Sequence, residues 1–162
     1  METLIIYLSK HGTAQKASRL IQKFLSPDNN VTTINLSHDN VPELSNYDRI
    51  IIGTSIYVGK GRRSFAKFCT NEYINLFAHK DLGLFLCGLE EDYQKQQKEL
   101  ESVFSERLLR HAKAKAFVGG EIIISKLNCL ERLTVRTILK ITTDVSTLDE
   151  NIIEEFVRKM EK

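Results

Sequence analysis

Several features that would indicate a membrane-spanning or secreted protein are missing from this chain of 162 residues. No apolar run approaches the ~20 residues that a membrane-spanning helix needs, and we find no signal peptide. The three cysteines, Cys69, Cys87 and Cys129, are far apart and form no Cys-x-x-Cys pair. A disulfide framework or a zinc site is therefore not expected. We expect reduced thiols and a cytoplasmic location.

The charge and the reactive side chains also exclude several classes of protein. A formal net charge of +2 is too small to indicate nucleic-acid binding by itself. The histidines His38, His79 and His111 show no metal-ligand spacing with cysteines or carboxylates, so no metal site is expected. No Ser/His/Asp or Cys/His arrangement can be assembled from loop positions. The sequence therefore favours chemistry carried by a bound cofactor and predicts no catalytic side chain.

The first twenty residues contain the clearest pattern in the sequence. Residues 3–8 form an almost unbroken apolar run, which is typical of a strand buried on both faces. A short loop follows, and from residue 17 apolar residues recur at helical spacing. Because N–H groups at a helix start attract anions, this arrangement predicts a site for a phosphate-bearing ligand. The loop consists of Ser9, Lys10, His11, Gly12, Thr13 and Ala14.

This loop does not match two common nucleotide-binding motifs. It lacks the GxxxxGK[ST] spacing, and Gly12 alone does not make a GxGxxG fingerprint. P-loop chemistry and ordinary dinucleotide binding are therefore not expected. An ordinary turn between a strand and a helix is the alternative to a phosphate site.

Strand-like and helix-like segments alternate along a single domain that spans residues 1–162. This alternation predicts a parallel sheet with helices on both faces. The first, third and fourth apolar runs are the most continuous and should be central, whereas the second alternates with polar residues and suits an edge. After residues 3–8, strands are predicted at 31–36, 49–54, 82–88 and 114–120, and the pattern of the last allows an extension to 124. Helices are predicted at 13–25, 62–77, 91–110, 127–140 and 148–161, with Ser146 or Thr147 as the cap of the last.

Three loops follow the predicted central strands. They are residues 9–14, 54–61 and 87–91. Ligands of open parallel sheets bind beyond the carboxyl ends of the strands, so these loops should converge on one planar, nucleotide-like cofactor. Tyr57 fits either a stacking contact with an aromatic ring or a half-buried surface position. Lys60, Arg62 and Arg63 fit either an anion contact or a solvated charge run.

Residues 126–140 are both basic and amphipathic. Leu127, Leu130, Leu133, Ile138 and Ile141 fall on one side of the predicted helix. The other side carries Arg132, Arg136 and Lys140, which are spaced four residues apart. This pattern fits peripheral contact with an anionic membrane, and it fits equally a helix with one side on the core and one side in water.

Parts of the sequence resemble the flavodoxin-like FMN proteins, and most of all the flavodoxin-type, menaquinone-dependent protoporphyrinogen oxidases. The residues that carry the resemblance are Thr3–Leu8 with Ser9–Gly12, Asn46–Ile56, Gly59 and Ser64–Phe68. The Tyr47-Asp48-Arg49 strand start that leads to Ser55-Ile56 is the most specific part. The resemblance implies a three-layer α/β sandwich with a five-stranded parallel sheet in the order 2-1-3-4-5.

The resemblance also implies a function. FMN would place its phosphate on loop 9–14 and its ring between loops 54–59 and 87–89. The protein would take electrons from a tetrapyrrole in heme biosynthesis and pass them to a quinone. The expected cofactor contacts are Ser9, Lys10, His11, Gly12, Thr13, Ala14, Thr54, Ser55, Ile56, Tyr57, Val58, Gly59, Cys87, Gly88 and Leu89.

Two alternatives to this enzyme remain open. The first is a flavodoxin-type electron carrier or quinone reductase, although carriers of this kind are typically acidic and this chain has a net charge of +2. The second is an interaction module that has the fold but binds no flavin. The fold alone does not decide among these functions.

Overall fold

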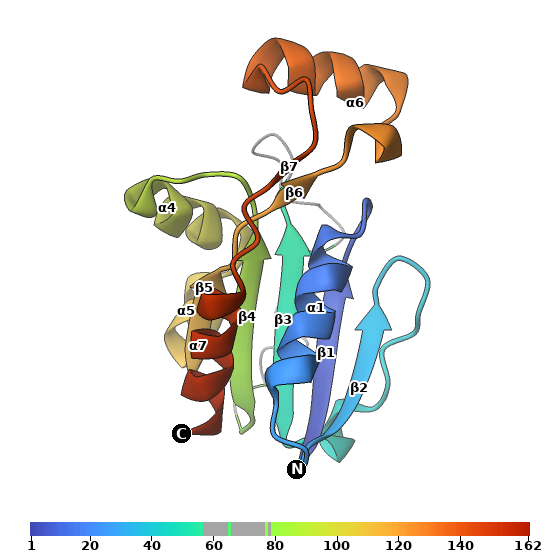
Figure 1. The fold of residues 1–162 in the computed structure, drawn as a ribbon. Coiled ribbons are helices and arrows are strands. Elements are labelled where there is room, and N and C mark those ends of the chain that lie inside the picture. The colour runs from blue at the N-terminus through green and yellow to red at the C-terminus, as the bar shows by residue number, and fades with distance from the viewer. Residues whose placement is uncertain (57–64, 66–76, 78) are drawn as a thin grey trace.

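The computed structural model describes residues 1–56, 65, 77 and 79–162. Five parallel strands form its main sheet in the order β2-β1-β3-β4-β5, as the sequence predicts (Figure 1). Strand β2 lies at one edge, and the three most apolar strands lie inside. The strands are β1 (Glu2–Leu8), β2 (Asn30–Asn35), β3 (Arg49–Ser55), β4 (Asp81–Cys87) and β5 (Ala114–Phe117).

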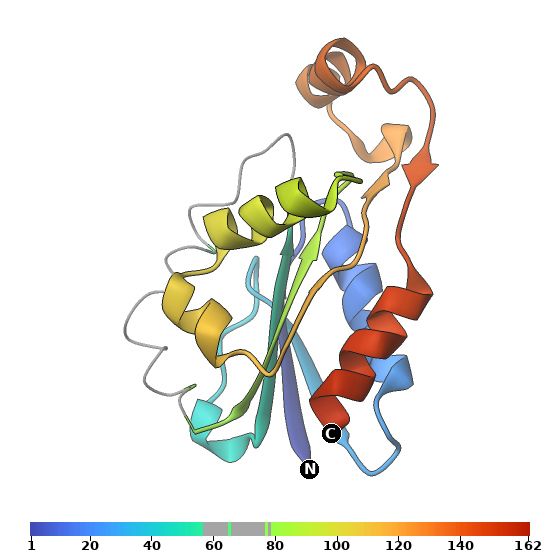
Figure 2. The ribbon, with the colours of Figure 1, turned by 90° about the vertical axis from the view of Figure 1, so that its left-hand side faces the viewer.

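Helices cover both faces of the sheet and make a three-layer sandwich (Figure 2). Helices α1 (Thr13–Phe24) and α7 (Glu150–Glu161) lie on one face. Helices α4 (Tyr93–Val103) and α5 (Glu106–His111) lie on the other. The predicted helix 62–77 lies outside the described residues apart from 65 and 77. None of the helices in the described ranges has the length and the hydropathy to cross a membrane.

The central strands supply two hydrophobic cores, one on each side of the sheet. Successive side chains of a strand point to opposite faces. Ile5, Ile51 and Phe85 therefore pack beneath α1 and α7, while Leu4 and Ile50 pack on the α4 side. All five of these side chains are completely buried. Such two-sided burial explains why these segments are apolar throughout rather than alternating.

Gly53 interrupts the apolar run of β3 for a steric reason. It is the register partner of Phe85 on β4. A Cβ at this position would lie 2.1–2.3 Å from three atoms of the Phe85 ring. The ring therefore occupies the space that a side chain at residue 53 would need.

Two predicted helices differ from the observed ones, one by a break in its middle and the other in its cap residue. The predicted helix 91–110 is divided, because Phe104 is extended and buried and Ser105 caps a new helix with its side chain. The cap of α7 is Asp149, whose carboxylate accepts hydrogen bonds from the N–H groups of Asn151 and Ile152. Ser146 and Thr147 do not cap it, since the Thr147 hydroxyl accepts the Gly120 N–H instead.

The chain leaves the sheet after β5, which is shorter than predicted. Gly119 has a φ of 77°, and a Cβ there would lie 1.9 Å from the Thr147 carbonyl oxygen. Beyond it, β6 (Glu121–Ile122) pairs antiparallel with β7 (Val145–Ser146) in a separate ribbon. Residues 123–144 extend from this ribbon beyond the strand ends, and we call them the projecting segment (Figures 1 and 2).

The predicted helix 127–140 is present in the projecting segment as an unbroken helical stretch over residues 129–139, made of two elements and preceded by a 3-10 turn. In chain order these are the 3-10 turn η2 (Ile124–Lys126), the helix α6 (Cys129–Thr134) and the π-helical turn η3 (Val135–Leu139). Asn128 caps α6 through a capping box with Glu131. Lys140 then ends the helical stretch in the left-handed conformation.

The contact between Gly53 and Phe85 predicts that Gly53→Ala is destabilising. Overpacking a core of this kind costs about 1–3 kcal/mol of the free energy of unfolding. Combining Gly53→Ala with Phe85→Leu should recover part of that loss, because the smaller side chain makes room for the methyl group. Urea unfolding of the wild type, both single variants and the double variant gives the coupling free energy. If the effects of the two substitutions on the free energy of unfolding were strictly additive, the Phe85 ring would not be the reason for a glycine at position 53.

Candidate functional site

The carboxyl ends of the parallel strands meet at one edge of the sheet. The strand register places Leu8 beside Thr54, and Ser55 beside Cys87. A cavity of about 380 Å³ lies at this edge. Its lining comes from the ends of β3 and β4 and the loops after them, from the start of α1, from α4, from the chain around β6 and from the projecting segment. The lining residues are Thr13, Ser55, Ile56, Cys87, Gly88, Leu89, Glu90, Glu91, Glu99, Gly120, Glu121, Ile122 and Leu139.

Backbone hydrogen bonds hold the loops after β3, β4 and β5 together. The Ile56 N–H donates to the Cys87 carbonyl oxygen at 2.8 Å, which joins the ends of β3 and β4. The Gly88 N–H donates to the Gly119 carbonyl oxygen at 3.2 Å, which joins the ends of β4 and β5. Of the three loops that the sequence predicts to converge, residues 54–56 and 87–91 are therefore joined by a backbone hydrogen bond, and loop 9–14 reaches the cavity through Thr13.

The loop before α1 has the geometry of an anion site. Gly12 has a φ of 95°, and α1 begins at the next residue without a side-chain cap. Inside the loop, the Gly12 N–H donates to the Ser9 hydroxyl oxygen at 3.1 Å. The first N–H groups of an α-helix have no partner within the helix, so those of α1 can bind an anion. Lys10 and His11 add basic groups to the same loop.

A carboxylate of the projecting segment contacts both basic side chains of this loop. Glu131 forms an ion pair with Lys10, and its Oε1 lies 3.1 Å from Nε2 of His11. Its Oε2 accepts the Asn128 N–H at 3.0 Å. Burial opposes ionisation of Glu131, but hydrogen bonds from Lys10, Asn128 and His11 outweigh it and lower its pKa to about 2. Glu131 is therefore an internal anion beside the proposed phosphate loop.

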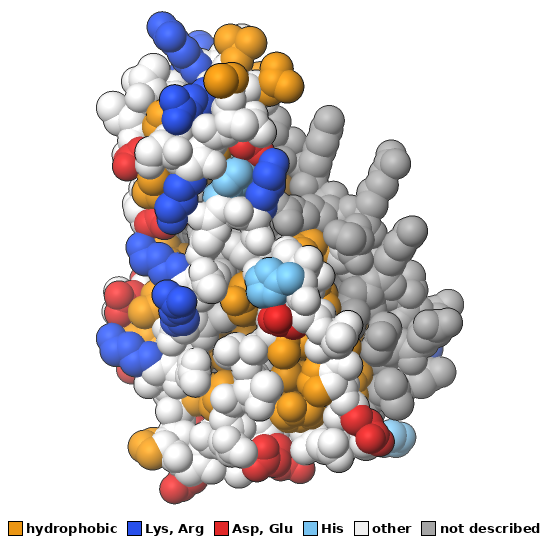
Figure 3. Space-filling model, turned by 90° about the vertical axis from the view of Figure 1, so that its right-hand side faces the viewer, with side chains coloured by type: hydrophobic (Ala, Val, Ile, Leu, Met, Phe, Trp, Pro, Cys, Tyr) orange, Lys and Arg blue, Asp and Glu red, His pale blue; other side chains and the backbone are white. Residues whose placement is uncertain are grey.

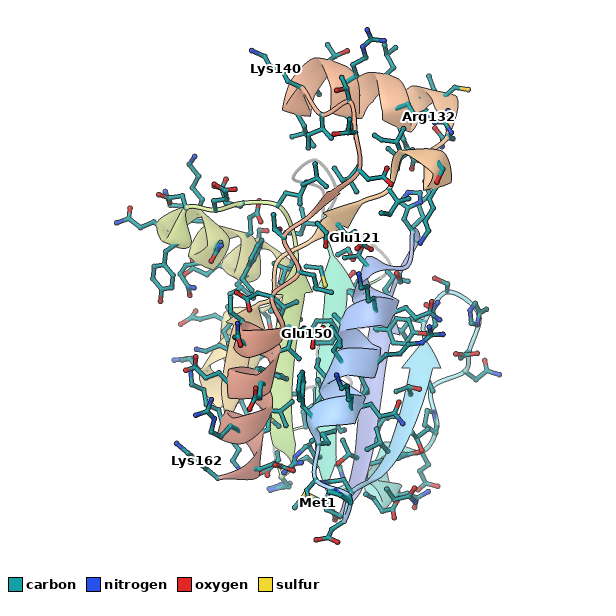
Figure 4. All side chains as sticks on the ribbon, viewed as in Figure 1. Met1, Glu121, Arg132, Lys140, Glu150 and Lys162 are labelled. Carbon is teal, nitrogen blue, oxygen red and sulfur yellow. The ribbon has the colours of Figure 1, made fainter. Side chains whose placement is uncertain are left out.

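A second glutamate, in strand β6 at the base of the projecting segment, contacts α1. Lys16 Nζ lies 2.7 Å from Glu121 Oε1, and the Thr13 hydroxyl donates to the Glu121 carbonyl oxygen at 3.3 Å. Figure 4 shows Glu121 at the edge of the sheet, beside the first turn of α1. These contacts and those of Glu131 hold the projecting segment over one side of the cavity.

The described part of the cavity lining is acidic. Its described residues include four glutamates, Glu90, Glu91, Glu99 and Glu121, and no lysine, arginine or histidine. One Glu99 carboxyl oxygen is buried and has no hydrogen-bond partner among the described residues. Burial, and to a smaller degree the charge of Glu90, raises the pKa of Glu99. The lining therefore favours a neutral or hydrogen-bond-donating group over an anion.

Ser55 and Cys87 form the inner wall of the cavity. Burial raises the pKa of the Cys87 thiol to about 12, against a weak opposing contribution from the Ser55 hydroxyl. The Ser55 oxygen is buried and makes no hydrogen bond of ordinary geometry with the described residues. Cys87 is thus a protonated, apolar wall at neutral pH, and Ser55 offers an unused hydroxyl to a ligand.

The chain matches the model of a flavodoxin domain over residues 4–149. It belongs to this family. Its structural neighbours include a short-chain flavodoxin associated with a PDU bacterial microcompartment, with a TM-score of 0.61, 12% identity, and coverage of 99% of this chain and 97% of that one.

Two further flavodoxins have similar folds. The flavodoxin of Streptococcus pneumoniae TIGR4 has a TM-score of 0.58 and 14% identity, and the comparison covers 99% of this chain and 98% of that one. The Fusobacterium nucleatum flavodoxin bound to flavin mononucleotide has a TM-score of 0.55, 15% identity and the same coverage. At these identities the likeness shows the fold. No curated protein matches the chain.

The flavodoxin domain brings together many, though not all, of the residues predicted for its site. Six of them line the cavity: Thr13, Ser55, Ile56, Cys87, Gly88 and Leu89. Ser9, Lys10, His11 and Gly12 form the adjoining loop.

Two of the predicted residues turn their side chains away from the cavity. Ala14 packs in the core beneath α1, and the Thr54 hydroxyl donates to the Leu8 carbonyl oxygen at 3.1 Å within the sheet. Each is completely buried, so neither side chain reaches a ligand. Tyr57, Val58 and Gly59 lie outside the described residues.

Other residues of the site were not predicted as contacts. Gly120 and Glu121 lie shortly after the fifth strand, so the rule that ligands bind beyond strand ends indicates them. Glu90 and Glu91 belong to the predicted loop 87–91, but they are not among the expected cofactor contacts. Nothing in the sequence pattern indicates Glu99, Glu131 or Leu139, which reach the site only through the placement of α4 and of the projecting segment.

The environment of Glu131 predicts how stability depends on pH. Its folded-state pKa is lowered from 4.5 to about 2, so its charged form stabilises the fold above pH 4.5 and this contribution is lost as the pH falls towards 2. Glu131→Gln should therefore lower the melting temperature at neutral pH. The difference in melting temperature between Glu131→Gln and the wild type should shrink as the pH falls from 4.5 towards 2, because protonation then removes the charge of Glu131 from the wild type as well.

Calorimetry from neutral pH down to the acid transition measures this difference. Glu101→Gln, at an exposed position of α4, is the matched control and should show no such convergence. A difference between Glu131→Gln and wild type that stays constant with pH would show that the ion pair does not cause it.

Proposed function

We propose that this flavodoxin domain binds FMN and transfers electrons as a carrier. The observation that carries the proposal is the uncapped start of α1, with Lys10 and His11 beside it, next to a cavity between the loops after β3 and β4. This arrangement combines a site for one phosphate group with space for a flat, largely apolar ring. The FMN-bound Fusobacterium nucleatum flavodoxin has the same fold and supports this choice of cofactor.

The described residues fit FMN in three respects. Residues 9–14 and the first-turn N–H groups of α1 would hold the phosphate. Ser55 and Ile56 on one side, and residues 87–89 on the other, would hold the ring. The unused Ser55 hydroxyl and the partnerless Glu99 carboxyl oxygen both line this cavity, so a ring with polar edges would give them partners.

The chain's own part in the chemistry is to position the cofactor and to exclude water. When bound, FMN supplies a redox group that accepts and returns electrons. Ile56, Leu89 and Ile122 give the cavity apolar walls that keep water out. The Cys87 thiol has a pKa of about 12 and is not a nucleophile at neutral pH. The cofactor, rather than the side chains that line the cavity, therefore carries out the redox chemistry.

The acidic lining favours an electron carrier over a protoporphyrinogen oxidase. Porphyrinogens carry propionate groups, which the four glutamates of the described lining would repel. The family match also supports a flavodoxin, without indicating a particular substrate. We therefore propose electron transfer to and from a protein partner or a neutral small molecule as the activity, with porphyrinogen oxidation as the competing assignment.

The proposal predicts that purified protein takes up FMN with a yellow absorbance band, and that Gly12→Val abolishes this uptake while the sheet still folds. A side chain at Gly12 would need an unfavourable left-handed φ of 95° and would obstruct the loop N–H groups. Thr33→Val, at an exposed position on β2, should bind like wild type. Flavin titration, with circular dichroism as the folding check, measures both effects.

Three results would contradict this assignment in different ways. Wild-type protein that ignores millimolar FMN would favour an interaction module without flavin. A released ligand with a mass other than that of FMN would exclude the cofactor. Rapid quinone-dependent oxidation of protoporphyrinogen by the FMN-loaded protein would favour the enzyme over the carrier.

The position of the phosphate can be tested by comparing FMN with riboflavin, which lacks that group. Lys10→Gln should weaken FMN binding roughly two- to fivefold, as for the loss of an exposed ion pair, and leave riboflavin binding unchanged. Glu131→Gln should tighten FMN binding by a similar factor, since the Glu131 carboxylate then no longer competes for Lys10 and His11. Isothermal titration measures these affinities. Equal effects on both flavins would place the phosphate elsewhere.

A further inference from the structure

The projecting segment exposes an unusual amount of apolar side chain. Leu130, Leu133 and Ile138 are 77%, 62% and 61% exposed, and Leu139 is also exposed. These four make up most of the large hydrophobic side chains that the described chain leaves in water; the others are Met1, Tyr93 and Ile152. A local concentration of such side chains on a soluble surface indicates an interaction site.

These residues are not needed to attach the segment to the sheet. Its inner face is already occupied by Leu127 and Val135, which are buried against Ile122, with Leu89 packed alongside. Glu121 and Glu131 make the polar attachments to α1 and its loop. The helical stretch therefore has a second apolar face, directed outward, which no described residue covers.

The charges around this outward face are positive. The segment contains Lys126, Arg132, Arg136 and Lys140 but only two carboxylates. Both carboxylates have partners within the protein, since Glu131 contacts the loop before α1 and the exposed Asp144 side chain accepts the Ile124 N–H at 2.8 Å. Figure 3 shows the hydrophobic side chains at the end of the molecule, close to lysine and arginine side chains.

Two of the four basic side chains remain directed outward. Arg132 Nε donates to the Ile124 and Leu127 carbonyl oxygens, so it stabilises the turn before α6. Lys126 Nζ lies close to Gly12. Arg136 and Lys140 are exposed, and Figure 4 shows Lys140 at the far end of the segment, away from the sheet. All four cations are exposed, and Arg136 and Lys140 are a pair whose side chains make no hydrogen bond or ion pair with the described residues.

We propose that the projecting segment docks on an anionic lipid bilayer. Leu130, Leu133 and Ile138 enter the boundary between headgroups and acyl chains, while Arg136 and Lys140 contact lipid phosphates. The small size of the patch favours lipid over protein, because three side chains on a protruding end cover far less than the roughly 800 Å² per partner of a stable protein interface. A bilayer accepts a protruding apolar end of this kind, and its negative surface complements the cations.

Vesicle binding tests the proposal directly and does not depend on bound FMN. Wild-type protein should sediment at low salt with vesicles of phosphatidylglycerol and phosphatidylcholine, but not with phosphatidylcholine alone. Arg136→Gln with Lys140→Gln should weaken partitioning on the order of 25-fold, about fivefold for each cation. Arg19→Gln with Lys98→Gln removes the same charge from α1 and α4 and should leave binding unchanged. High salt should reproduce the effect of the first pair by screening.

Insertion of the apolar side chains needs its own measurement. The chain contains no tryptophan, so a single Leu133→Trp reporter is unambiguous. Its emission should shift to the blue with anionic vesicles, whereas Ile152→Trp, at an exposed position of α7, should not respond. Leu130→Asn should weaken vesicle binding with an unchanged melting temperature, because its side chain is exposed.

Three outcomes would overturn the proposal. The first is wild-type protein that does not bind anionic vesicles at low salt. The second is binding that the variants of the projecting segment do not weaken. The third is a lipid-free dimer, seen by light scattering, which Leu130→Asn dissociates, since a second copy of the chain would then cover the face. None of these outcomes bears on whether the cavity binds FMN.

Discussion

The alignment of the parallel strands at one edge of the sheet is the constraint on which the other features depend. Backbone pairing fixes Leu8 beside Thr54, and Ser55 beside Cys87. The loops that follow β1, β3 and β4 therefore start side by side at the same edge of the sheet. Burial on both faces keeps that register, because a shift of one residue would move every side chain to the wrong layer. The cavity, the anion loop and the base of the projecting segment all lie at this edge.

The charges at this edge are divided between two neighbouring places. The loop before α1 holds Lys10 and His11, whereas the cavity holds glutamates. A phosphate-bearing ring compound fits this division if its phosphate lies on the basic side and its neutral ring on the acidic side. On the basic side, the Glu131 carboxylate already contacts both Lys10 and His11, so a phosphate there would compete with it. Lys10 and His11 therefore connect the loop before α1 to the projecting segment.

The projecting segment depends on one turn of the backbone. Gly119 takes a φ of 77° against the Thr147 carbonyl, which ends the sheet and starts the β6–β7 ribbon. From there the chain supplies Leu139 and Glu121 to the cavity, Glu131 to the anion loop, and an uncovered apolar face to the surroundings. The chain between β5 and α7 thus contributes to the site and also presents a surface of its own.

The sequence by itself determined the features that depend on neighbouring residues. The apolar runs predicted the central strands, and the pattern around Gly12 predicted the strand, loop and helix, because both follow from local periodicity and from backbone groups at a helix start. Only the tertiary structure decided that Ala14 and Thr54 face inward, that Glu131 reaches Lys10, and that Leu130 remains in water. These outcomes depend on where the chain returns after leaving the sheet. Contacts between residues more than a hundred positions apart leave no periodic signal in the sequence.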